Sequence, residues 1–122
     1  MSEDNFKPRV VALILNGKTE EALELLAAEY RVKVPNLKVG LPKKHKKTAF
    51  GCYTAQTQTI SVLNSDILAN PFVILHEFYH HLRSSPVDRV HRGTEGNADH
   101  FAMDFLLAYQ TAALKSSLGH FS

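Results

Sequence analysis

The chain has 122 residues, close to the commonest size of one domain, and 44% of them are apolar, which is enough for one hydrophobic core. Its formal net charge of +2 is near neutral, so charge alone indicates no nucleic-acid or membrane partner. Cys52 is the one cysteine, which excludes an intramolecular disulfide.

The N-terminal part of the chain predicts two helices and a strand. Residues 1–9 are polar, and the apolar run that follows is too short for a secretory signal or a membrane span, so we expect an intracellular, cytoplasmic protein. A short helix is predicted over 8–15, and Thr19 is expected to cap a second helix that ends near residue 30. Loosely alternating β-branched residues predict a strand over 32–39, interrupted at Pro35.

A lysine-rich loop and a hairpin come next. Four lysines between residues 43 and 47 could contact phosphates or an anionic membrane surface, but such a run is more often a solvated loop. No aromatic residue interleaves with them, so we expect no nucleic-acid partner. Residues 48–54 and 57–63 predict two strands of a hairpin. The hairpin either covers the next helix or offers its edge to an extended peptide, with Gly51 permitting close approach.

The most informative segment is His76-Glu77-Phe78-Tyr79-His80. It lies in an apolar helix that should begin with Asn70 as N-cap and Pro71 as first residue, and end near residues 83–85. Residues four apart share one face of a helix, so His76 and His80 can reach one metal ion. Glu77 then lies near enough to act on a metal-bound water.

The last helix, predicted over 95–114, supplies further candidates. Glu95 could close the site as third metal ligand, and Asp99 could accept the outer ring N–H of a metal-bound histidine. Alternatively, both are first-turn acids that the helix dipole favours. His91 in the polar connection 84–94 is the candidate for stabilising the developing negative charge of a carbonyl oxygen, and Tyr53 in the hairpin is a second. His81 points about 100° away from His80 and should not bind the same ion.

Together these residues resemble the gluzincin metallopeptidases, the group that includes thermolysin, in which H-E-x-x-H precedes a helix with E-x-x-A-D. The phrase E-G-N-A-D-H-F-A is also similar to the ImmA/IrrE-type peptidases, and the small size most resembles the minigluzincins. The resemblance covers about residues 30–110. It implies His76, His80 and Glu95 as ligands of one zinc ion, Glu77 as general base and acid, and Asp99 as the residue that orients a histidine ligand. Larger members supply an oxyanion-stabilising histidine or tyrosine from a second subdomain, and we expect no such subdomain here.

We therefore expect a small single-domain α+β protein with a zincin-like fold. A short, mostly antiparallel sheet of about three strands should pack on the motif helix, the Glu-bearing C-terminal helix and the N-terminal helices. The catalytic domain is expected over 1–115, followed by a tail over 116–122. The expected activity is that of a zinc metalloendopeptidase acting on a peptide or protein substrate. The alternatives are a latent zymogen or inactive scaffold whose cleft a terminal segment blocks, and a module that binds a peptide or regulator without cutting it.

Overall fold

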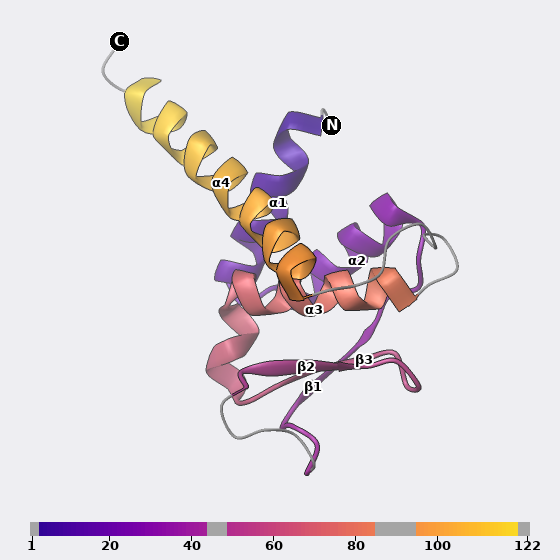
Figure 1. Cartoon of the computed structure of the whole chain (residues 1–122). Coiled ribbons are helices and arrows are strands. Elements are labelled where there is room, and N and C mark those ends of the chain that lie inside the picture. Colours follow the sequence, from indigo (N-terminus) through magenta and orange to yellow (C-terminus); the bar gives the residue numbers. More distant parts are fainter. Residues whose placement is uncertain (1–2, 44–48, 85–94, 120–122) are drawn as a thin grey trace.

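The computed structural model describes residues 3–43, 49–84 and 95–119 (Figure 1). Within these ranges it contains helices and strands whose bounds are α1 (Glu3–Leu15), α2 (Thr19–Tyr30), β1 (Asn36–Val39), β2 (Gly51–Thr54), β3 (Thr59–Val62), the 3-10 helix η1 (Ser65–Ala69), α3 (Pro71–Ser84) and α4 (Glu95–Gly119). The predicted α+β class is therefore confirmed.

Helix α3 is the middle layer of the molecule (Figure 1). It packs against β2 and β3 on one side and against α1 and α4 on the other. Its apolar residues are accordingly buried on several sides, and Ile74, Leu75 and Phe78 have no exposed surface. Burying large side chains of this kind stabilises the fold by about 1.5–3 kcal/mol each. The motif histidines thus sit on the element whose position the core determines most strongly.

The sheet has the strand order β1-β3-β2. Strand β3 pairs in parallel with β1 and antiparallel with β2, so the sheet is mixed rather than mostly antiparallel. The predicted hairpin is confirmed as β2–β3, and its turn is closed by a hydrogen bond from the Gln58 N–H to the Ala55 carbonyl at 3.2 Å. Among the described strands β2 is an edge, which the sequence left open.

All three described strands are shorter than predicted, and β3 spans Thr59–Val62 instead of residues 57–63. Strand β1 begins only after Pro35, which has no N–H to donate to a ladder, so the expected segment 32–35 is not part of it. Strand β2 begins at Gly51; Ala49 and Phe50 precede it, and residue 48 lies outside the described residues. The side of the sheet that meets α3 includes Ile60 and Val62, both fully buried.

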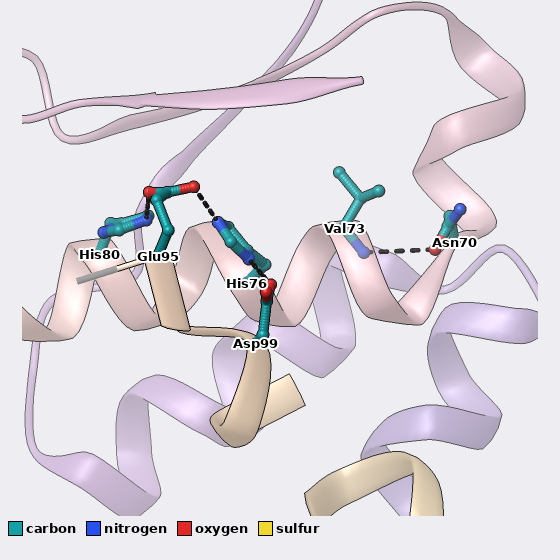
Figure 2. A network of polar contacts seen from close by, with 6 residues as sticks. All are labelled: Asn70, Val73, His76, His80, Glu95 and Asp99. Carbon is teal, nitrogen blue, oxygen red and sulfur yellow. Dashed lines mark hydrogen bonds and ion pairs between the residues drawn. The ribbon is translucent and has the colours of Figure 1, made fainter. Parts of the chain in front are cut away.

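The start of α3 agrees with the prediction in detail. The Asn70 side-chain oxygen accepts a hydrogen bond from the Val73 N–H at 3.2 Å (Figure 2). Pro71 is the first helical residue, where its missing N–H costs no helical hydrogen bond. The helix ends at Ser84, two residues before Pro86.

The N-terminal helices differ from the prediction in two respects. Helix α1 begins at Glu3, five residues earlier than expected, and it contains Pro8. Pro8 is the sixth helical residue and cannot donate the backbone hydrogen bond to the residue four before it, yet α1 continues through it to Leu15. Helix α2 spans the predicted residues, but Thr19 is not its cap: the N-cap is Lys18, and the Thr19 hydroxyl donates to the Leu68 carbonyl at 2.5 Å.

Helix α4 begins at Glu95 as predicted but continues to Gly119, so the expected tail boundary at 116 falls inside the helix. At 1.5 Å per residue its 25 residues extend about 37 Å. Figure 1 shows that it leads away from α3. In the part of the chain that the structure describes, no helix is both long and apolar enough to cross a membrane.

Candidate metal centre

The two motif histidines and Glu95 converge at the junction of α3 and α4 (Figure 2). His76 Nε2 lies 3.0 Å from Glu95 Oε2, and His80 Nε2 lies 2.8 Å from Glu95 Oε1. One ligand atom from each of the three residues lies within 4.8 Å of the others. The structure therefore brings together the three predicted metal ligands from two separate stretches of the chain.

Asp99 lies one helical turn after Glu95 and contacts the opposite nitrogen of His76. Its Oδ1 is 2.9 Å from His76 Nδ1 (Figure 2). A carboxylate oxygen only accepts, so Nδ1 carries the proton and donates it. The other ring nitrogen, Nε2, is also within hydrogen-bond distance of a carboxylate, Glu95 Oε2 at 3.0 Å, and as a metal ligand it would carry no proton. This is the orientation that the sequence predicted for Asp99.

The contacts of Glu95 with the rings of His76 and His80 indicate whether a cation fits between them. Among the described residues His80 Nε2 is buried and has no hydrogen-bond partner, although Glu95 Oε1 lies 2.8 Å away. Burial lowers the pKa of His80, while Glu95 raises it, and the net direction is downward. A cation between the two rings and Glu95 would give this buried His80 nitrogen a partner. Two nitrogens and one oxygen form the donor set of a catalytic zinc site with one open position.

Glu77 lies beside this cluster but does not point into it as a ligand. Only 7% of the residue is exposed. Burial raises the pKa of its carboxyl to about 7, since the lowering effect of His76 is opposed by the charge of Glu95. A carboxyl that titrates near neutral pH is suited to accept and return a proton.

Two cavities flank the cluster along β2. The larger, about 480 Å³, extends toward the end of α3 and is lined by residues that include Tyr53, His80 and Ser84. The smaller, about 220 Å³, extends toward the start of α3 and is lined mainly by apolar side chains, among them Phe50 and Phe72. Both are bordered by Ala49, Gly51, Glu77 and Glu95. The cluster thus lies in the middle of one cleft between β2 and α3.

Gly51 permits the close approach of β2 to α3, whereas the sequence suggested that it would permit close approach of a peptide to the hairpin edge. A Cβ atom at this position would lie 2.8 Å from Val73 Cγ1 and 3.4 Å from Glu77 Cγ. The first distance is too short for any side chain, so an alanine would force β2 and α3 apart. Gly51 therefore sets both the width of the cleft and the position of Glu77.

We expect Gly51→Ala to lower the free energy of unfolding by about 1–3 kcal/mol, because it overpacks a well-filled contact. It should also reduce any turnover at this site, since Glu77 must shift with Val73. Chemical denaturation and a steady-state assay measure the two effects. Gly96→Ala is the control, because a Cβ at Gly96 meets no atom of the described residues within 4 Å. A Gly51→Ala protein with unchanged stability would contradict this view of the cleft.

The other candidates have different positions. His91 and most of the lysine run, at 44–47, lie outside the described residues. His81 is only 2% exposed and faces the sheet rather than the metal ligands, as expected from its place on the helix. Burial lowers the pKa of its imidazole. Tyr53 does reach the larger cavity, but its hydroxyl contacts His81 Nδ1 at 2.7 Å, a contact that sequence reasoning missed because residues 28 apart give no local signal.

Comparisons with protein-family models, curated proteins and solved structures find no match to this chain. The assignment of the site therefore depends on the arrangement of its own residues.

Proposed function

We propose that the chain is a zinc-dependent metallopeptidase that hydrolyses peptide bonds. One observation carries the proposal: His76, His80 and Glu95 converge from two helices, with the buried carboxyl of Glu77 beside them. When bound there, zinc would lower the pKa of a water molecule toward neutrality and polarise a carbonyl group.

Three carboxylate residues of the site would each have a different role in the reaction. Glu77 takes the proton from the attacking water and returns it to the leaving amine, which its near-neutral pKa allows. Glu95 would be a metal ligand, and Asp99 accepts a hydrogen bond from His76 Nδ1, so that Nε2 is the ring nitrogen that would bind the metal. Two carboxylates that border the same cleft thus have separate roles, because one is buried and the side chain of the other is 79% exposed.

The edge of β2 supports a peptide as the substrate. The Leu63 N–H bonds the Phe50 carbonyl at 2.8 Å, so these residues form a hydrogen-bonded pair of the β2–β3 ladder. Such pairs alternate along an antiparallel ladder, so the backbone groups of Gly51 and Tyr53 point away from β3. Both residues border the larger cavity. An extended peptide can therefore pair with this edge while its backbone crosses the metal centre.

The test is hydrolysis of a denatured protein or a quenched fluorescent peptide library. We expect cleavage with zinc, loss of cleavage after exhaustive chelation, and recovery with about one equivalent of zinc per chain. Cleavage that is equally fast in the metal-free protein would contradict the proposal. So would a zinc-loaded, folded protein that cleaves no member of the library.

The length of α4 weighs against the alternative of a cleft blocked by the C-terminal tail. Glu95 and Gly119 are separated by almost the whole helix, about 36 Å. Residues 116–119 of the predicted tail belong to α4, and residues 120–122 lie outside the described residues. A binding module remains the second alternative, and peptide binding that persists after chelation without cleavage would favour it.

A further inference from the structure

The contacts of His81 link three parts of the chain beside the larger cavity. Its Nε2 is 2.7 Å from the Lys33 carbonyl, just before β1, and its Nδ1 is 2.7 Å from the Tyr53 hydroxyl on β2. The Ser84 hydroxyl donates to the His81 carbonyl at 2.8 Å and lies 3.2 Å from the Tyr53 oxygen. Tyr53 and Ser84 both line the larger cavity, while His81 is buried behind them.

These contacts determine where the protons are. A carbonyl only accepts, so His81 Nε2 must carry a proton and donate it to Lys33. No carboxylate is among the described partners of His81, whose ring neighbours are Tyr53 and Phe78, and a buried unpaired imidazolium is costly. The ring is therefore neutral, and its Nδ1 is an acceptor.

The remaining proton then belongs to Tyr53. With Nδ1 as acceptor, the Tyr53 hydroxyl donates to His81, and Ser84 has already committed its own proton to the His81 carbonyl. The Tyr53 oxygen consequently has lone pairs but no free proton on the side of the cavity. It cannot donate to a carbonyl oxygen that becomes negatively charged, which is the role that the sequence suggested for it.

Building on the proposed peptidase function, we propose that Tyr53 is a substrate-binding residue that accepts a hydrogen bond from an N–H group of the bound peptide, and that His81 is the positioning residue that holds its hydroxyl in this orientation. The backbone of Tyr53 faces the same cleft, so one residue offers the substrate both a strand edge and a side-chain acceptor. His81, on α3, also contacts both β2 and the segment before β1.

The proton assignment is tested by ¹⁵N NMR of the metal-free chain. We expect His81 to have a protonated Nε2 and an unprotonated Nδ1, and the Nδ1 resonance to shift in Tyr53→Phe. A protonated Nδ1 would overturn the proposal, because Tyr53 would then be free to donate. This measurement needs neither zinc nor turnover, so it decides the assignment even if the chain proves not to be a peptidase.

The binding role is tested by the kinetics of Tyr53→Phe, with Tyr109→Phe on α4 as the matched control. Loss of one accepted hydrogen bond should raise KM about tenfold and change kcat less than about threefold. A fall in kcat of about 10²-fold at unchanged KM would overturn the proposal, since it is the signature of a lost donor to the transition state. If the wild-type chain cleaves nothing, the dissociation constant of a peptide takes the place of KM. A constant that is the same for wild type and Tyr53→Phe would then overturn it.

Discussion

The Glu77→Gln protein is expected to bind zinc as the wild-type chain does and to hydrolyse peptides about 10²–10⁴-fold more slowly. Glutamine keeps the size of the side chain but cannot take a proton from water at neutral pH. The three ligand atoms belong to other residues, so metal affinity should change little. Zinc titration and a peptidase assay on the same preparation measure the two properties.

The same substitution should stabilise the metal-free protein at alkaline pH. Burial raises the pKa of Glu77 from the usual 4.5 to about 7, so the folded state retains a proton that the unfolded state releases in this range. The favourable contribution of protonated Glu77 to the free energy of unfolding is complete below pH 4.5, and it is lost as the pH rises through 7. At pH 8 Glu77→Gln should exceed the wild type in unfolding free energy by about 2–3 kcal/mol, and below pH 4.5 the difference should vanish. Denaturant unfolding of the metal-free proteins at several pH values measures it.

Glu24→Gln is the matched control for both effects, because Glu24 is an exposed carboxylate on α2. It should change neither turnover nor the pH dependence of stability. Full peptidase activity in Glu77→Gln would show that the role assigned to Glu77 is wrong. A stability difference between wild type and Glu77→Gln that does not depend on pH would contradict the perturbed ionisation of the carboxyl.

Loss of a metal ligand should lower zinc affinity more than loss of the carboxylate that orients a ligand. His80→Ala is expected to lower zinc affinity about 10²–10³-fold, because one of three protein donors is lost. Asp99→Asn should lower it about 10–100-fold, because an amide orients His76 less well than a carboxylate does. Isothermal titration with zinc measures both constants.

His100→Ala is the control in this series, because His100 is an exposed histidine beside Asp99 that belongs to no ligand cluster in the described chain. It should leave affinity unchanged. Equal affinities for wild type and His80→Ala would refute the ligand set. An effect of Asp99→Asn larger than that of His80→Ala would mean that Asp99, rather than His80, binds the ion.

The helix that carries the motif was predictable because its signals are local. Asn70 and Pro71 mark its start, and Pro86 limits its end. The four-residue spacing of His76 and His80 then places both rings on one face without any knowledge of the tertiary fold. The same spacing relates Glu95 to Asp99, and the structure brings these two pairs together.

Features that depend on contacts between distant segments were not predictable from local patterns. Strand β1 is parallel to β3, and the paired residues, such as Asn36 and Thr59, are 23 positions apart in the sequence. The Thr19 hydroxyl bonds a carbonyl 49 residues away instead of capping its own helix. The link from Tyr53 to His81 is of the same kind, and it reverses the role that Tyr53 would be given from the sequence.

The most direct test of the account is a titration of the metal-free chain with Co²⁺, followed by visible absorption spectroscopy and compared with His80→Ala. We predict saturation at about one equivalent, with the intense d–d bands of a four- or five-coordinate ion bound by two nitrogens and one oxygen. His80→Ala should not show these bands at the same cobalt concentration. A wild-type spectrum that keeps the weak bands of hexaaqua cobalt, or one that His80→Ala reproduces, would contradict the account.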